Sequence, residues 1–252
     1  MIKRIDFMSL SVVRGLILKE TKVGEADKIL TLLVKGVGKI SVGAKGSRKT
    51  KGALSSGTSL FTYADFTLRS GSKFYYMVQA DIICSFYSLT NDIDTMAYAS
   101  YLLELTEKIT MEDIPADETL KLLINILKKM MDKKLNPRLA ASIYEFKLLQ
   151  YNGFMPHLSN CVRCGKPHNN YMSMQGVLCT DCAKNEYFSL PVSDELLYTM
   201  NYVISNELPS LLNFSLNQET LDLFRKISSK MTEVQFSLNL NSKKFLESLN
   251  LY

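Results

Sequence analysis

Four cysteines in two pairs restrict what this chain can fold into more than any other feature of its sequence. They form two Cys-x-x-Cys turns, separated by fourteen residues: Cys161, Cys164, Cys179 and Cys182. Each turn lets two thiolates reach one ion, and four sulfur ligands make the closed tetrahedral site that structural zinc occupies. We therefore predict one structural Zn²⁺ per chain, and iron in the same four-sulfur geometry is the alternative.

Three further residues could take part in metal or thiol chemistry. His157 and His168, the only two histidines, lie beside and within the segment between the turns, and we expect neither to replace a cysteine ligand. Cys84 is the fifth cysteine, and we expect a small buried apolar residue there rather than a reactive thiol. Paired cysteines of this kind fit a reducing compartment better than a disulfide framework does.

The hydropathy of the chain predicts neither a membrane span nor a secretory signal. The longest nearly apolar stretch, residues 29–34, is far too short to cross a bilayer, and the first six residues lack an apolar core. With 46% hydrophobic and 22% charged residues, the 252-residue composition is that of an ordinary folded protein. We expect a cytoplasmic protein with no membrane partner.

Basic residues are concentrated at the beginning of the chain. Residues 1–80 contain fourteen Lys or Arg and five Asp or Glu, a balance of +9, whereas the remaining 172 residues have a balance of −4. Such an asymmetry indicates a basic first domain with a polyanionic partner and a mildly acidic second domain.

The first third of the sequence has the pattern of short strands separated by Gly, Ser and Lys. The expected strands are residues 10–18, 28–34, 39–44, 59–68 and 73–82. Five antiparallel strands in so few residues are typical of a small closed barrel, of which the OB-fold is the common five-stranded form. We predict an OB-fold over residues 1–83, and half of a β-sandwich is the alternative.

The period changes to that of helices after Thr90, so we predict an α-helical domain over residues 84–252 and an α+β protein overall. A cap at Asn91 or Asp92 and a proline in a first turn, Pro137, mark two of the helix starts. The expected helices begin near residue 93 and cover 116–133, 137–150, 193–205, 218–236 and 242–249. The zinc knuckle interrupts this domain at residues 157–190.

A basic, glycine-flanked loop lies between the third and fourth expected strands, over residues 45–52. Its lysines and arginine can follow a phosphate backbone, although a charge run of this length can also be a solvated loop. We predict a nucleic-acid-binding surface made of Lys39, Lys45, Arg48, Lys49, Lys51, Arg69 and Lys73. Aromatic residues on the last two strands could stack bases if they point outward, but each is more simply explained as barrel core. They are Phe61, Tyr63, Phe66, Phe74, Tyr75 and Tyr76.

No catalytic motif is present that would predict an enzyme. The sequence has no paired carboxylate motif, no HExxH and no GxSxG. Residues 52–58, GALSSGT, have the glycine spacing of a phosphate-binding loop but a threonine where its lysine belongs. None of these patterns marks an active site.

Several segments, taken in order, resemble the RecO family of bacterial recombination mediators. They are Gly15-Leu-Ile-Leu, Gly24-Glu-Ala-Asp27, residues 38–46 (GKISVGAKG), Tyr101-Leu-Leu-Glu104-Leu, residues 148–156 (LLQYNGFMP) leading into Cys161-Val-Arg-Cys164-Gly, and Ser242-Lys-Lys-Phe-Leu. Together they cover nearly the whole chain, and their order is more specific than any single segment. One departure concerns residues 52–57 (GALSSG), which stand where we expect a further basic or proline-containing stretch.

The resemblance implies an N-terminal OB-fold and a helical domain interrupted by a zinc knuckle. It implies a nucleoid-associated role in DNA repair without catalytic turnover, so we expect that the protein is not an enzyme. It also implies binding and annealing of single-stranded DNA. The implied partners are RecR and the C-terminal tail of the single-stranded-DNA-binding protein, with a functional link to loading of the recombinase RecA. Two other classes stay open: an adaptor in transcription or translation with the same two modules, and a zinc-ribbon enzyme.

Overall fold

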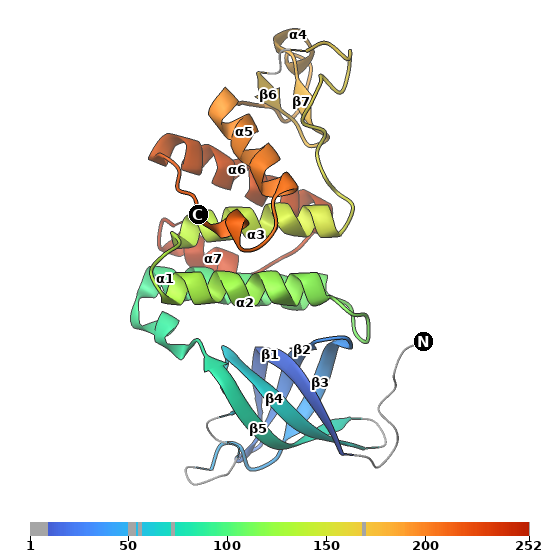
Figure 1. Ribbon diagram of the computed structural model, residues 1–252, viewed down its shortest axis with the longest axis vertical. Coiled ribbons are helices and arrows are strands. Elements are labelled where there is room, and N and C mark those ends of the chain that lie inside the picture. Colours follow the sequence, from blue (N-terminus) through green and yellow to red (C-terminus); the bar gives the residue numbers. More distant parts are fainter. Residues whose placement is uncertain (1–9, 50–53, 55–56, 72–73, 168–169, 252) are drawn as a thin grey trace. The chain divides into compact units, whose positions relative to one another are not determined.

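Five strands at the beginning of the chain close into a barrel in the order β1-β2-β3-β5-β4. The computed structural model in Figure 1 describes residues 10–49, 54, 57–71, 74–167 and 170–251. The strands are β1 (Leu10–Val23), β2 (Asp27–Val34), β3 (Gly38–Ala44), β4 (Thr62–Ser70) and β5 (Tyr75–Ser85). The predicted five-stranded barrel is confirmed, and β1 extends five residues beyond its expected end.

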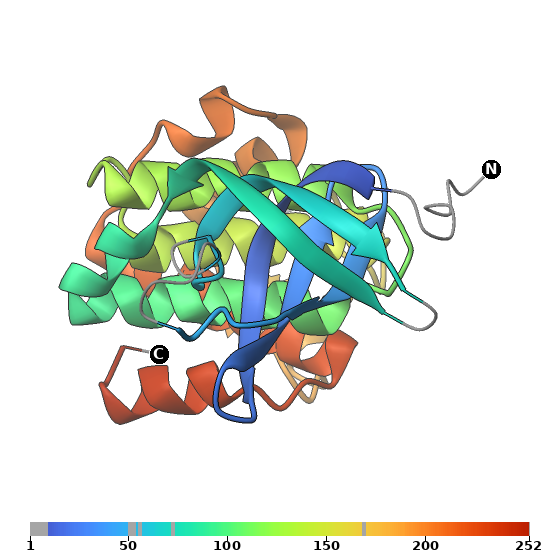
Figure 2. The same cartoon turned by 90° about the horizontal axis from the view of Figure 1, so that it is seen from below.

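Long antiparallel ladders join most neighbouring strands. In β1, Leu16 pairs with Leu33 of β2 on one side and with Tyr63 of β4 on the other. Strands β3 and β5 run parallel, and their recorded pairs among the described residues are Val42 with Tyr75 and Gly43 with Tyr76. The barrel is therefore closed by a short seam between β3 and β5, and Figure 2 shows its strands from below.

Alternate residues of the strands fill the barrel. Along β3 and the first seven residues of β4, buried side chains alternate with partly exposed ones, as the period of two for a half-buried strand requires. The core contains Ile17, Leu30, Leu32, Val34, Ile40, Val42, Ala44, Ala64, Phe66, Leu68 and Met77. These side chains form one apolar cluster inside the barrel.

Helices make up most of the remaining described chain, as predicted. They are α1 (Ile93–Ile109), α2 (Asp117–Met131), α3 (Pro137–Tyr151), α5 (Asp194–Ser205), α6 (Gln218–Phe236) and α7 (Asn241–Ser248), with the short elements η1 (Tyr87–Asn91), α4 (Thr180–Ala183) and η2 (Ser210–Leu212). Side-chain caps fix several starts: Asp92 accepts a hydrogen bond from Thr95 N, and Asn136 accepts one from Arg138 N. Among the described residues, no helix is both long and apolar enough to cross a membrane.

Packing divides the chain into two units, residues 1–131 with 240–246 and residues 132–239 with 247–252. Helices α1 and α2 belong with the barrel because polar contacts attach them to it. Lys39 Nζ donates to the carbonyl oxygen of Glu107 at 2.6 Å, and Gly36 N donates to Asp117 Oδ1 at 2.7 Å. The domain boundary expected between residues 83 and 84 stays a prediction.

The beginning of α7 is attached to α1 within the first unit. The carboxylate of Glu104 accepts hydrogen bonds from the backbone N–H groups of Asn241, at 3.1 Å, and Ser242, at 2.7 Å. Burial by itself would raise the pKa of Glu104, but the bonds from Ser242 and Asn241 outweigh it and hold that pKa below its usual value. Glu104 of α1 therefore caps the N-terminus of α7.

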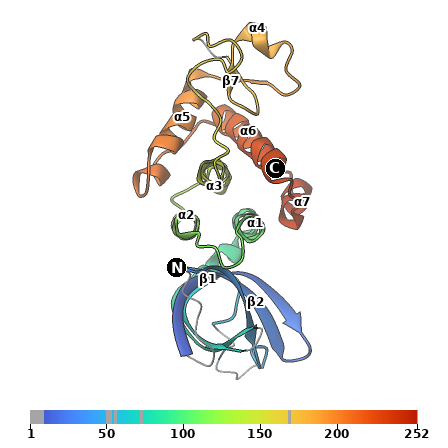
Figure 3. The same cartoon turned by 90° about the vertical axis from the view of Figure 1, so that its right-hand side faces the viewer.

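Helix α3 is the centre of the second unit, where it contacts α5 and α6. Figure 3 looks along α3, with α5 and α6 on either side of it. Every residue of α3 from Leu139 to Leu149 is buried, and these include Glu145. Its carboxylate is paired with Arg225 of α6 and accepts a hydrogen bond from Ser228 Oγ at 2.7 Å. The buried charge is thus compensated across the α3–α6 contact.

Candidate metal centre and nucleic-acid interface

The four predicted cysteine ligands come together in one cluster. Their Sγ atoms all lie within 4.8 Å of one another, and those of Cys164 and Cys179 are 3.8 Å apart. A tetrahedral ion with Zn–S bonds of about 2.3 Å separates its sulfurs by about 3.8 Å. The arrangement therefore fits a metal ion bound by four thiolates, one pair from each turn.

Local backbone chemistry shapes the two turns. In the first, Gly165 has a φ of +73° and its N–H donates to the carbonyl oxygen of Cys161 at 2.8 Å. A positive φ is readily adopted by glycine, which explains the residue after Cys164. In the second, Cys179 stands directly before α4, and its carbonyl oxygen accepts from Ala183 N at 3.0 Å. Each pair thus starts from a turn held by its own hydrogen bonds.

A small sheet brings the two turns together. It contains β6 (Tyr171–Met172), β7 (Val177–Leu178) and β8 (Leu190–Pro191) in the order β7-β6-β8. Val162, between the first two cysteines, donates its N–H to Val177 O at 3.0 Å. Gly176 passes so close to His157 that a Cβ would lie 2.2 Å from the His157 carbonyl oxygen. The three strands of this sheet, each only two residues long, are not predicted from the sequence.

His157 does not belong to the cysteine cluster that the described residues form. His157 Nε2 lies 2.9 Å from Ser159 Oγ, and the metal-binding group contains the four cysteines alone. His168 lies outside the described residues. Cys84 lies on β5, opposite Tyr63, and is only partly buried, so the expected role as a buried packing residue stays a prediction.

The thiols of the cluster differ in how easily they ionise. Backbone hydrogen bonding, chiefly from Cys179, lowers the pKa of Cys161 to about 6, and hydrogen bonding with Cys179 and Cys164 raises the pKa of Cys182 to about 12. A second thiolate is disfavoured beside the first because like charges repel. A divalent cation would remove that penalty, so the donor set is matched to a metal ion.

The predicted basic loop is fixed to the turn between β1 and β2. Arg48 Nη1 donates to Gly24 O, and Gly46 N donates to Asp27 Oδ1, each at 2.8 Å. Lys45 and Lys49 are exposed, and Lys45 Nζ lies 5.3 Å from the centre of the Tyr76 ring. The structure thus gathers three of the predicted cations, Lys45, Arg48 and Lys49, at one end of the barrel.

The other predicted DNA-binding residues occupy different surroundings. Arg69 is exposed near the end of β4, whereas Lys39 is partly buried and donates to the carbonyl oxygen of Glu107. The contact with α1 could not be foreseen from the pattern of β3. Lys51 and Lys73 lie outside the described residues. The role of all these residues in DNA binding stays a prediction.

The aromatic residues of β4 and β5 divide into core and surface groups. Phe61 and Phe66 are buried, Tyr63, Tyr75 and Tyr76 are partly exposed, and the side chain of Phe74 is the most exposed of the six. Phe74 and Tyr76 line a pocket at the β3–β5 seam, together with Lys45. Strand alternation alone does not reveal this pocket because it depends on the long-range contact between β3 and β5.

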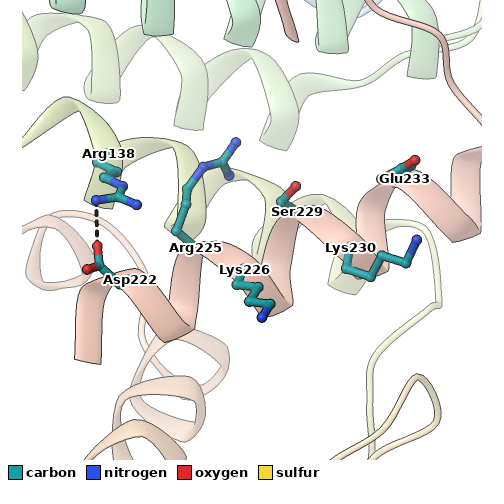
Figure 4. A pocket seen from close by; sticks show the side chains of 7 residues that line it. All are labelled: Arg138, Asp222, Arg225, Lys226, Ser229, Lys230 and Glu233. Atoms are coloured by element: carbon teal, nitrogen blue, oxygen red, sulfur yellow. Dashed lines mark ion pairs between the residues drawn. The ribbon is translucent and has the colours of Figure 1, made fainter. Parts of the chain in front are cut away.

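A second basic surface, also missed from the sequence, lies in the helical unit. It is a groove of about 480 Å³ between α3 and α6, lined by Arg138, Asp222, Arg225, Lys226, Ser229, Lys230 and Glu233. Figure 4 shows Lys226 and Lys230 side by side along α6, while Arg138 of α3 forms an ion pair with Asp222. The charges of Arg138 and Arg225 are balanced by Asp222 and Glu145. Lys226 and Lys230 outnumber the remaining carboxylate, Glu233, so the groove is net positive.

Comparison with known proteins places both halves of the chain in one family. Residues 8–86 match the family model of the recombination protein O N terminal domain, and residues 90–244 match that of the recombination protein O C terminal domain. The DNA repair protein RecO of Acetivibrio thermocellus is 31% identical over 94% of this chain and 96% of its own length. That of Alkaliphilus metalliredigens is 32% identical over 90% and 95%. This chain therefore belongs to the RecO family of DNA repair proteins.

Proposed function

We propose that the protein is a recombination mediator in DNA repair that binds and anneals single-stranded DNA without catalytic turnover. One observation carries the proposal: Lys45, Arg48 and Lys49 project from a loop that hydrogen bonds hold at one end of an OB-type barrel. Cations on such a loop can bind the phosphates of a single strand and neutralise their charge. Two complementary strands coated in this way repel each other less, which favours annealing.

The metal in the cysteine cluster is Zn²⁺ in this proposal, and its role is structural. Four thiolates complete a tetrahedral shell, so no ligand position is open to a reacting water. Iron would bind the same ligands, and metal analysis distinguishes the two. The ion holds the segment from His157 to Leu190 in shape and does not touch DNA.

The proposal includes RecR and the single-stranded-DNA-binding protein as partners in loading RecA. The groove between α3 and α6 is the surface we assign to the tail of the single-stranded-DNA-binding protein, taken as an acidic peptide, because Lys226 and Lys230 are accessible there. Reversing both charges with Lys226→Glu and Lys230→Glu should abolish peptide binding in a fluorescence-anisotropy titration. The same reversal at Lys121 and Lys128 on α2 is the matched control. Equal effects of the two pairs would contradict the assignment.

Two assays separate the proposal from its rivals. The first is titration of the protein with labelled single-stranded DNA, and the second is annealing of complementary strands coated with single-stranded-DNA-binding protein. A mediator binds the strand and accelerates annealing. A transcription or translation adaptor would lack the annealing activity, and a zinc-ribbon enzyme would show neither. Tight binding without acceleration of annealing would refute the mediator function while leaving the DNA site in place.

The salt dependence of binding tests the loop itself. Each phosphate contact with a single strand releases roughly 0.7 of a counterion, so replacing Lys45, Arg48, Lys49 and Lys51 with Ala should flatten the slope of log affinity against log salt by up to about 3 units. The change should be similar for different base sequences because phosphate contacts carry no sequence information. Annealing should slow in parallel.

The control for this experiment removes the same charge elsewhere. Ala at Lys121, Lys128, Lys134 and Lys166, all exposed in the helical part of the chain, should leave the slope unchanged. A loop variant that keeps the wild-type slope and the wild-type annealing rate would show that the loop is only a solvated surface.

A further inference from the structure

The pocket at the β3–β5 seam has the size and lining of a site for one nucleobase. It encloses about 170 Å³ and is lined by Val23, Asp27, Lys28, Ile29, Val42, Gly43, Ala44, Lys45, Phe74 and Tyr76. An apolar cavity of about 150 Å³ accepts a benzene ring. The pocket therefore has room for a single aromatic ring system and not for a stack of two.

Glycines fix the position of the Tyr76 ring within the pocket. Gly43 pairs with Tyr76 across the seam, and a Cβ on Gly43 would lie 3.2 Å from Tyr76 Cδ1. A Cβ on Gly71 would lie 2.8 Å from Tyr76 Cε2. Because both neighbours lack side chains, the ring is held closely between two backbone segments. An aromatic ring that is already fixed loses little freedom when a base stacks on it.

Three exposed apolar side chains from different parts of the barrel meet at this site. Val23 at the end of β1 is 42% exposed, Ile29 in β2 is 44% exposed, and Phe74 before β5 is 55% exposed. Single exposed apolar residues are common, but their convergence on one pocket points to an occupant with an apolar face. A nucleobase provides such a face, and any base can stack on an aromatic ring.

The charged groups of the pocket indicate that the occupant also carries phosphate. Lys28 Nζ is paired with Glu20 at 2.9 Å and donates to Thr58 O at 3.2 Å, and Asp27 accepts from the backbone of the basic loop. The ammonium of Lys45, by contrast, lies over the Tyr76 ring. A phosphate beside the pocket would attract this ammonium more strongly than the ring does, and its departure would uncover the ring.

We infer that one base of a bound single strand enters this pocket and stacks on Tyr76, with Phe74 at the rim, while Lys45 moves to an adjacent phosphate. The inference rests on the proposed binding of single-stranded DNA and adds a contact to bases that the basic loop does not supply. A duplex cannot use the pocket without unpairing, because the faces of its bases are covered by their neighbours. The site therefore favours single strands over duplexes of the same charge.

The test compares an ordinary labelled strand with a strand of equal length whose central nucleotides are abasic. Both carry the same phosphates, so the loop contributes equally to each. Stacking of one base is worth about 1–3 kcal/mol, so the wild-type chain should bind the abasic strand about 5-fold to about 150-fold more weakly. Tyr76→Leu should weaken binding of the ordinary strand by a similar factor, lose nothing further on the abasic strand, and keep the wild-type salt slope.

Two more variants keep the test decisive if Tyr76→Leu does not fold. The chain contains no tryptophan, so Phe74→Trp places a single fluorophore at the rim of the pocket. Its emission should be quenched by the ordinary strand and much less by the abasic strand. Tyr87→Leu, at an exposed tyrosine outside the pocket, should behave as wild type in every measurement.

The outcomes separate this inference from the function on which it rests. Equal affinity for the two strands, with a steep salt slope retained, would overturn the base pocket and leave the DNA-binding function standing. Equal quenching of the Phe74→Trp variant by both strands would overturn it as well. Absence of any binding to the ordinary strand at low salt would refute both.

Discussion

The barrel and the cysteine segment obtain their structure from different sources. The barrel has a core of eleven buried apolar residues, from Ile17 to Met77. The corresponding core of the cysteine segment contains Cys161, Leu178 and Ala183, and half of the residues packed against it are cysteines too. Burial of apolar surface can stabilise the first region unaided, whereas the second has too little of it. A metal ion bound by the four cysteines would replace the missing core.

The barrel also has longer hydrogen-bonded ladders than the cysteine segment. Strands β1 and β4 of the barrel pair over seven consecutive residues, from Leu10 with Arg69 to Leu16 with Tyr63. Strands β6 and β7 pair over two. Long ladders make the barrel cooperative, while two-residue strands contribute little stability of their own. Perturbing one of these two regions should therefore leave the other intact.

Removing a ligand of the metal should have the largest effect. Cys164→Ser should lose the metal and unfold the segment from residue 157 to 190, because apparent binding energies of structural zinc reach about 10–16 kcal/mol in zinc-finger peptides. Metal analysis should find about one zinc in the wild-type chain and none in the variant, and limited proteolysis should cut the variant within this segment.

Cys84→Ser provides the matched control because Cys84 lies outside the cluster. It should retain the metal. Binding of single-stranded DNA should survive in Cys164→Ser, since the proposed DNA site lies in the barrel. Loss of DNA binding in a variant whose barrel stays folded would mean that we have assigned the DNA site to the wrong region.

A cavity in the barrel core should destabilise the barrel, which is the second of the two regions compared. Phe66 is fully buried, and Phe66→Ala should lower the free energy of unfolding by about 3–5 kcal/mol, measured by denaturant titration. Phe74→Ala, at a largely exposed position, should cost less than about 0.5 kcal/mol. Zinc content should be unchanged in both. Release of the metal at the unfolding midpoint of Phe66→Ala would show that the two regions unfold together.

Removing the cap that Glu104 supplies to α7 should have the smallest effect on stability, and this effect should depend on pH. The pKa of Glu104 is lowered in the folded state, so its carboxylate stabilises the fold above the ordinary glutamate pKa of about 4.3, and this contribution disappears as the pH falls through the lowered folded-state value. Glu104→Gln should cost about 1–2 kcal/mol at pH 7 and less near pH 3. Thermal unfolding at both pH values measures this difference.

Glu118→Gln is the corresponding control on α2, where the carboxylate is exposed and its ion pair with Lys121 is 4.0 Å long. It should have almost no effect at either pH. If Glu104→Gln lowered the free energy of unfolding equally at both pH values, neutral hydrogen bonding or packing, and not the charge of Glu104, would attach α7 to α1.

Local patterns were sufficient to predict most elements of this fold. Alternation over residues 39–44 predicts β3, and the helical period with Pro137 in a first turn predicts α3. The cysteine spacing predicts the metal ligands because each pair is defined by a turn of four residues. These features depend on neighbours in the sequence, so they can be recognised before any tertiary contact is known.

Features that depend on contacts between distant residues could not be predicted in this way. The engagement of Lys39 with Glu107, the Tyr76 pocket opposite Gly43, and the groove lined by Arg138 and Lys226 all join separate elements. The strands β6, β7 and β8 were missed because two residues are too few to show a period. Their formation follows from the backbone hydrogen bonds that surround the cysteines.

The burial of α3 has a consequence for how the second unit opens in water. Eleven consecutive residues of this helix are buried, and one of them carries a charge whose partner is on α6. Solvent can reach its amides only when α5 and α6 separate from it, so local fraying should not expose them. Hydrogen–deuterium exchange should therefore be slowest in α3 and should occur at the rate set by opening of the whole unit. Exchange in the two cysteine turns should instead follow the concentration of a zinc chelator.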